Sequence, residues 1–458
     1  MNAGQKELYR KGSCGKEFVL RYGARTLIRM GWGMRWSFVL LVLYMNMLNL
    51  IPMPGTFGVR ANVILPMLLG NSLFITVCLS RFCWVKRSPF WKWLIGFTFF
   101  LILNIFYTWL AYPGEPVINA VKTFSTFTVL FTYFVFLKAA EEDLDRFLHM
   151  IIALSSLLAA LFLLQAVAYN LKEIQFLSIY GFNYGTVFLD FRNGHIRLIA
   201  SDLVDFSAVV SIGCICSGTI LPCRKKRYWI HLLLVLFYEL FVGQTRAVLL
   251  IIAGAGGMSL LFMKRKNTAG KIITVFIMIF GVILLADDMF YILSKLLSSV
   301  TSRTDYSMYH RIDSYVYYLK IMAQKPFFGI GLLPAYPLLQ ENNILVSGGR
   351  QYTFSDVGIA GVAGKLGLTG VIFYIIPIWT AWKRYIVSGR KDRMNFVLCW
   401  GMILAMLSLS LFDAERMMVL AVFMAVSDAS YQRFKKERDR HDGCSQSACH
   451  YRAELSGV

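Results

Sequence analysis

The chain has 458 residues, of which 57% are hydrophobic and 16% are charged, and its formal net charge is +21. A soluble domain carries about a quarter charged residues, so this composition and a mean hydropathy of +0.57 exclude an ordinary soluble fold. Long apolar runs separated by polar segments instead predict an all-α, polytopic membrane protein.

The positive charge does not by itself indicate a nucleic-acid-binding protein. Lys and Arg of a membrane protein collect in its cytoplasmic loops and tails, which accounts for the excess. The sequence offers no basic helix or stacking platform free of the membrane, so we expect no nucleic-acid partner. The nine cysteines show neither metal nor disulfide spacing.

About twelve apolar runs can cross a hydrocarbon core of about 30 Å at about 1.5 Å per residue, some only just. They lie at residues 36–53, 61–80, 91–112, 117–137, 147–169, 202–222, 228–243, 246–263, 271–287, 362–382, 395–411 and 415–430. The region 228–263 is too long for one span, so we divide it near Gly243 into two short helices.

Basic clusters set the orientation of these spans. They lie at residues 1–35, 81–87, 224–227, 264–266, 383–393 and 435–440. With twelve spans every cluster falls on one side of the membrane, so we expect both termini in the cytoplasm. The expected parts are a basic tail (1–35), a transmembrane domain (36–430) and a C-terminal tail (431–458). Two longer outer loops lie at about 170–201 and 288–361.

The second outer loop contains a segment, residues 309–331, that is too polar to span a bilayer and too apolar to be a linker. Its apolar stripe consists of Ile312, Val316, Leu319 and Met322. This spacing predicts one face of an amphipathic helix. Pro326 is expected to end the helix, and the two glycines that follow are expected to turn the chain.

Three arginines fall on the outer side, against the positive-inside bias: Arg197, Arg246 and Arg311. For each arginine taken alone, a side chain that merely reaches the lipid headgroups is as good an explanation as a binding role. Together they face one compartment, and two of them flank the long outer segments. A guanidinium binds phosphate through two parallel hydrogen bonds and stays charged, so the set predicts a site for a diphosphate headgroup.

Outer carboxylates are candidates for the general base of a transfer reaction. They are Asp190, Asp202, Asp205, Asp287, Asp288, Asp305, Asp313, Glu341, Asp356, Asp413 and Glu415. Asp356 stands out because glycines recur at every third position from Gly358 to Gly370. Such a stripe lets a helix or an acyl chain approach closely, and plain helix packing is the simpler interpretation. Asp313 is a candidate ion-pair partner of Arg311.

Other polar residues give weaker predictions. His310 is a candidate phosphate donor or base beside Arg311, and an interfacial histidine without a role is the alternative. No histidine pair has metal spacing and no Asp-x-Asp motif occurs, so we predict neither a metal nor another cofactor. Lys122 lies inside the fourth apolar run, where a buried lysine would need a partner, and Glu239 is a candidate.

The segment from Arg311 to the sequence KPFFGIG at 325–331 resembles the signature of the O-antigen polymerase and ligase superfamily (Wzy-type). That signature pairs an arginine with a downstream Pro-x-x-Gly-x-Gly turn. Arg197 and the QTRA sequence at 244–247 resemble two further arginine boxes. Residues 355–370 resemble the stretch before the next span in capsule and exopolysaccharide polymerases of Gram-positive bacteria.

The resemblance implies a metal-independent, inverting glycosyltransferase in a bacterial plasma membrane. Its donor would be a glycan on undecaprenyl diphosphate, and its partners would include the flippase and chain-length regulator of the same pathway. Arg197, Arg246 and Arg311, with His310, would hold the diphosphate. An acceptor hydroxyl would attack the anomeric carbon.

One departure concerns the base. Ligases of the family usually carry a His-Asn pair soon after the Gly-x-Gly turn, but residues 332–361 contain no histidine. This favours a polymerase over a ligase and leaves the base open between Asp356 and Glu341. A flippase for lipid-linked oligosaccharide and a non-enzymatic membrane scaffold are two further interpretations of the same sequence.

Overall fold

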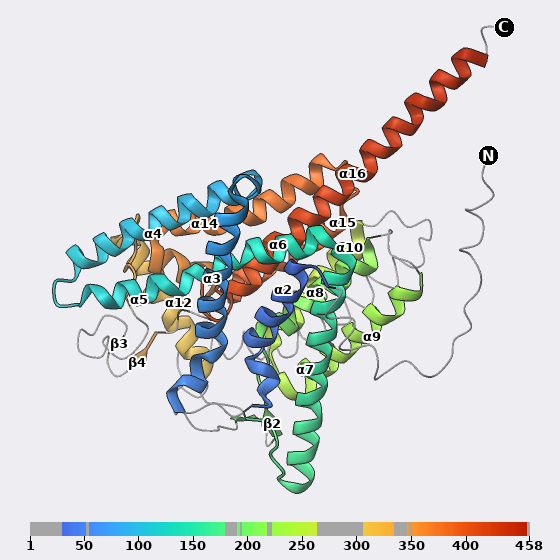
Figure 1. Ribbon diagram of the computed structural model, residues 1–458. Helices are drawn as coiled ribbons and strands as arrows, with labels where there is room; N and C mark the ends of the chain where they lie inside the picture. Colours follow the sequence, from blue (N-terminus) through green and yellow to red (C-terminus); the bar gives the residue numbers. More distant parts are fainter. Residues whose placement is uncertain are drawn as a thin grey trace.

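The computed structural model describes residues 30–51, 55–178, 190–192, 195–217, 222–262, 306–333, 346–347, 350–352, 354 and 356–455. Predicted features outside these residues are the span at 271–287, Asp287, Asp288, Asp305 and Glu341, and the side chains of Asp190, Arg246 and His310. Within the described part, the protein is a bundle of helices with two small hairpins (Figure 1).

The first half of the bundle contains α2 (Trp32–Tyr44), α3 (Gly55–Arg87), α4 (Trp91–Ala111), α5 (Val117–Phe127), α6 (Tyr133–Glu142) and α7 (Leu144–Lys172). The second half contains α8 (Asp202–Cys216), α9 (Pro222–Tyr238), α10 (Arg246–Phe262), α12 (Tyr306–Gln324), α14 (Gly358–Val387), α15 (Arg393–Ser408) and α16 (Met417–Leu455). Strands β1 (Asp190–Arg192) and β2 (His195–Arg197) form one antiparallel hairpin, and β3 (Val346–Ser347) and β4 (Arg350–Gln351) form the other.

Five helical stretches are long and apolar enough to cross a membrane: Asn62–Arg87, Trp91–Ala111, Val117–Glu142, Leu144–Lys172 and Gly358–Val387. The fold class of a helical, multi-pass membrane protein is therefore confirmed, with the two hairpins as an addition. The count of twelve spans stays a prediction. The division of the region 228–263 agrees with the structure, because a π-helical turn ends at Gly243 and α10 begins at Arg246.

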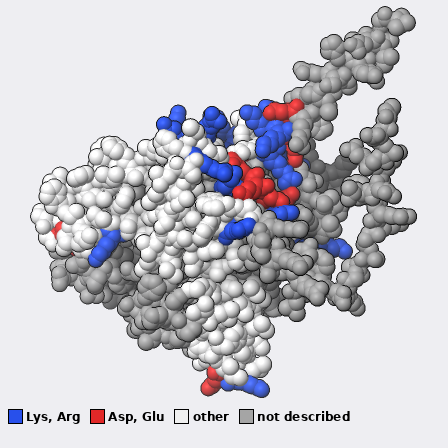
Figure 2. Space-filling model, viewed as in Figure 1, with Lys and Arg blue, Asp and Glu red and all other residues white. Residues whose placement is uncertain are grey.

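Polar contacts join helices near the basic clusters at 383–393 and 435–440. Arg433 of α16 forms an ion pair with Asp145 of α7 at 2.9 Å, and Arg393 of α15 donates to the carbonyl of Cys216 at 3.2 Å. Figure 2 shows Lys and Arg gathered near the point where α16 leaves the body, beside a broad surface of other residues. We call the end of the bundle at which these Lys and Arg gather the basic end, and the end far from it the opposite end.

Helix α16 forms the centre of the bundle. Its first ten residues, from Met417 to Val426, are at most 3% exposed. Toward the basic end, a buried Arg384 of α14 pairs with Asp428 of α16 and donates to the Ser427 hydroxyl at 2.7 Å. Paired burial of this kind avoids an isolated charge in an apolar interior. Beyond the body, α16 continues as one helix through Leu455 (Figure 1).

Candidate functional site

The predicted turn after α12 is a tight structure that docks on α14. Gly329 and Gly331 have positive φ angles of 63° and 84°. The amide of Ile330 donates to the carbonyl of Gly364 at 2.9 Å, and that of Gly331 donates to the carbonyl of Lys365 at 3.0 Å. The left-handed backbone and these close contacts explain why glycine is required here.

The glycine stripe of α14 serves this packing. A Cβ atom at Gly364 would lie 2.4 Å from the ring of Tyr318 in α12. Gly367 has a φ of 69° that breaks the helix locally, and the next amide, that of Leu368, donates to the carbonyl of Pro326 at 2.7 Å. The simpler interpretation of the stripe, helix packing, is therefore confirmed for these two glycines.

The face of α12 that packs is not the predicted apolar stripe. Tyr318 and Ser314 are fully buried, whereas Val316 and Leu319 are 47% and 46% exposed. The prediction of a helix is confirmed. Two residues of the predicted stripe, Val316 and Leu319, face outward, and Ile312 and Met322 are half-buried. An outward apolar face suits a helix that lies at a membrane surface.

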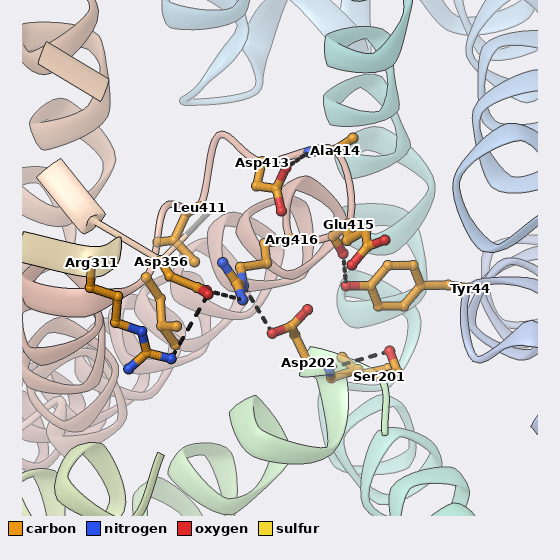
Figure 3. Close-up of polar contacts among 12 residues, drawn as sticks. Tyr44, Ser201, Asp202, Arg311, Asp356, Leu411, Asp413, Ala414, Glu415 and Arg416 are labelled. Atoms are coloured by element: carbon orange, nitrogen blue, oxygen red, sulfur yellow. Dashed lines mark hydrogen bonds and ion pairs between the residues drawn. The ribbon is translucent and has the colours of Figure 1, made fainter. Parts of the chain in front are cut away.

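This packing brings Arg311 next to Asp356. Their side chains approach to 3.8 Å between Nη2 and Oδ2 (Figure 3). Arg311 is 50% exposed and Asp356 is 35% exposed. A pair this accessible contributes only about 0–1 kcal/mol, because water competes for both charges. Charge-assisted bonds to phosphate contribute about 1.5–3 kcal/mol each, so an anionic ligand can displace the carboxylate from Arg311.

A fourth arginine lies on the other side of Asp356. Arg416, which directly precedes α16, has its Nη2 atom 3.6 Å from Oδ1 of Asp356. Its Nε atom donates to Oδ1 of Asp202 at 3.0 Å, and the side chain is only 15% exposed (Figure 3). Arg416 therefore joins the start of α8 to the loop before α14.

The loop that carries Arg416 is itself held in place. The hydroxyl of Tyr44 in α2 donates to the carbonyl of Glu415, and the Arg416 amide donates to the carbonyl of Asp413 at 2.9 Å. Asp413 lies near Arg416 and Lys365. Burial raises the pKa of Asp413, and the two neighbouring cations only partly offset this.

Arg197 lies at the same end of the bundle but in a separate contact. Its Nε atom donates to the carbonyl of Gly243 at 3.1 Å, and its charge lies close to Glu239. Glu239, which is 2% exposed, lies beside Asp205. Asp205 in turn interacts with Asp202 and Arg416, so a series of charged interactions connects Arg197 to Arg416.

Two sequence predictions about charged pairs need correction. Lys122 is exposed on α5, so it is not a buried lysine. Glu239 is buried, is hydrogen-bonded to Asp205 and lies near the charge of Arg197 instead. An exposed lysine near the start of a span can reach the membrane surface along its own aliphatic stem.

Arg311 lies 3.8 Å from Asp356, a residue far along the chain. Among the residues that the structure describes, no group of three His, Cys, Asp or Glu is placed to hold a metal ion.

The middle of the chain, residues 231–375, matches the family model described as O-antigen ligase. This match supports the O-antigen polymerase and ligase superfamily for that part of the chain. Members of this superfamily are glycosyl-transfer enzymes. A search of curated proteins found no match.

The O-antigen ligase match covers only part of the site. It includes Arg246, Arg311 and Asp356, and it ends before Arg416. Arg416 was missed by the sequence reasoning, although the signal was present: it follows Asp413 and Glu415 in the short polar segment between two apolar runs on the outer side. The positive-inside argument that singled out the other three arginines applies to it as well.

Proposed function

We propose that the protein polymerises oligosaccharide repeat units carried on undecaprenyl diphosphate, by inverting glycosyl transfer at the outer face of a bacterial plasma membrane. The observation that carries the proposal is the accessible guanidinium of Arg311 at the opposite end of the bundle. It lies beside the carboxylate of Asp356, whose other oxygen faces Arg416. The match to a glycan-transferring superfamily supports the reaction class.

In the proposed reaction, Arg311 binds the diphosphate that leaves. Arg197, Arg246 and His310 are proposed to add contacts to the lipid diphosphate. Positive groups aimed at the developing charge stabilise the transition state more than the ground state, and each such bond contributes about 1.5–3 kcal/mol. No metal is needed in this scheme, because the guanidinium groups neutralise the leaving group.

The acceptor hydroxyl attacks the anomeric carbon from the face opposite the diphosphate, which inverts the configuration. Asp356 or Glu341 accepts the hydroxyl proton. Asp356 has support from geometry, because it lies beside the arginine that would hold the leaving group. The proton transfer to Asp356 and the departure of the diphosphate would then take place within one site.

We assign the opposite end to the outer side because, among the described residues, Lys and Arg gather near the point where α16 leaves the body. Both termini would then be cytoplasmic. Donor and acceptor would enter from the bilayer, on which the exposed apolar stripe of α12 would rest. A flippase and a chain-length regulator of the same pathway are the proposed partners.

A ligase is the second candidate, because the matching family model is described as O-antigen ligase. A flippase is less well supported, because Lys122, a charged residue within a predicted span, is exposed rather than buried.

The test uses the purified protein in liposomes that contain repeat units on undecaprenyl diphosphate, extracted from cells that carry the gene. We expect a ladder of lengthening lipid-linked glycans. Transfer of one finished glycan to a different lipid or protein acceptor would identify a ligase. Movement of the donor across the bilayer without a new glycosidic bond would overturn the proposal in favour of a flippase.

A further inference from the structure

The carboxylate of Asp356 faces two arginines through two different oxygen atoms. Oδ2 lies 3.8 Å from Nη2 of Arg311, and Oδ1 lies 3.6 Å from Nη2 of Arg416. Both distances are longer than a hydrogen bond, so each oxygen is attracted by charge without being locked in place. Figure 3 shows Asp356 between the two guanidinium groups.

The two arginines differ in how firmly they are held. Arg416 is 15% exposed and is hydrogen-bonded to Asp202. Arg311 is 50% exposed and lies in the first two turns of α12. A ligand from the membrane or from solvent therefore reaches Arg311 far more easily than Arg416.

We propose that Arg416 is a positioning residue and that donor binding exchanges the partner of Arg311. This inference rests on the proposed function. The lipid diphosphate takes Arg311 away from Oδ2 of Asp356, while Oδ1 stays directed at Arg416. The freed Oδ2 then accepts the proton of the acceptor hydroxyl.

Atoms and electrons balance in this step. The acceptor oxygen forms a bond to the anomeric carbon of the donor glycan, and its proton passes to Oδ2 of Asp356. The bond between the anomeric carbon and the diphosphate oxygen breaks, and its electron pair leaves with the diphosphate held by Arg311. No oxidant, reductant or further reactant is required.

The exchange makes base activation depend on the donor. Before the donor binds, Arg311 occupies Oδ2 and restricts its access to a hydroxyl. After the donor binds, the same arginine neutralises the leaving group. The carboxylate of Asp356 competes with the incoming diphosphate for Arg311. Asp356 should therefore weaken donor binding, although it is needed for transfer.

The first test measures binding of sugar-free undecaprenyl diphosphate to the full-length protein in nanodiscs, with undecaprenol as the neutral control lipid. We expect Asp356→Asn to bind the diphosphate about three- to tenfold more tightly than the wild type, because a competing negative charge is removed. We also expect its transfer rate to be lost. Equal or weaker binding by Asp356→Asn would overturn the exchange alone. A wild-type protein that does not distinguish the diphosphate from undecaprenol would overturn the proposed function as well.

The second test separates positioning from donor binding at Arg416. We expect Arg416→Gln to lower kcat by at least about tenfold with donor KM within about twofold, and Arg416→Lys to restore part of kcat. A large rise in donor KM at unchanged kcat would instead make Arg416 a donor-binding residue and overturn the assignment.

Arg433→Gln is the matched control, because it removes an arginine from an ion pair with Asp145 at the basic end. We expect it to leave kcat and donor KM near the wild-type values. If Arg416→Gln accumulates less folded protein, kcat is referred to the folded fraction measured by size-exclusion chromatography. An equal loss of kcat in Arg433→Gln and Arg416→Gln would show a general structural effect and overturn the positioning role.

Discussion

Arg416 donates to Asp202 across 3.0 Å, and this contact links the segment before α16 to the first residue of α8. The same guanidinium faces Asp356, which in turn faces Arg311. Segments from the middle and the end of the chain therefore meet at one point of the bundle. The site is a product of the folded bundle rather than of a single loop.

The first prediction concerns Arg311. We expect Arg311→Ala to abolish transfer while the protein remains folded in the membrane, because a half-exposed residue contributes little to packing. Arg311→Lys should also be impaired, since an ammonium lacks the planar fork that binds two phosphate oxygens. Polymer analysis on gels, together with the protein level in membrane fractions, measures both effects. Abundant full-length polymer in Arg311→Ala would contradict the role.

The second prediction concerns the packing of α14. Gly367→Ala places a Cβ atom 2.3 Å from the backbone of Phe327 and also strains a positive φ angle. Gly389→Ala strains a similar φ angle of 63° but meets nothing within 4 Å. Strain alone costs about 1–2 kcal/mol, so Gly367→Ala should lower Tm clearly more than Gly389→Ala. Thermal unfolding in detergent measures the difference, and equal Tm values would contradict the close packing.

The third prediction is a pH dependence from Asp413, whose pKa is raised by burial. A carboxyl whose native pKa is raised binds protons more readily in the folded state, so its contribution to stability falls as pH rises through that pKa. Asp413→Asn mimics the protonated form. Its Tm relative to the wild type should therefore increase as pH rises from about 4 to 7. Parallel unfolding scans across this range test the sign, and a relative Tm that falls with pH would refute it.

The fourth prediction is that Lys122→Leu leaves transfer activity close to the wild-type level. The side chain is exposed on α5, outside the charged contacts of the site. Steady-state kinetics on membranes with matched protein levels would check this. A loss of activity as large as that of Arg311→Ala would give Lys122 a functional role that its exposure does not explain.

Much of the fold was predictable because apolar runs and turn residues act locally. The end of α12 before Pro326, the glycine turn after it and the break before α10 all depend on neighbouring residues, and all three agree with the structure. The orientation of α12 was harder to predict. Its buried face includes Tyr318, which packs against Gly364 of α14 and within a small apolar cluster with Ile330 and Val357.

The site was only partly predictable from the sequence. Arg311 and Asp356 were both singled out by local signals, but their contact depends on the docking of α12 and α14. The outer position of Arg416 was readable from the sequence, but its pairing with Asp202 and Asp356 was not, because these partners come from distant parts of the chain. Charge pairing between separate helices leaves no periodic pattern in the sequence.

The most direct test of the proposed reaction is the release of undecaprenyl diphosphate during glycan transfer by the purified protein in liposomes. We expect one undecaprenyl diphosphate to be released for each new glycosidic bond by the wild type, and no release above background by Arg311→Ala. Release by Arg311→Ala at the wild-type rate, or new bonds without release of the lipid diphosphate, would contradict the reaction.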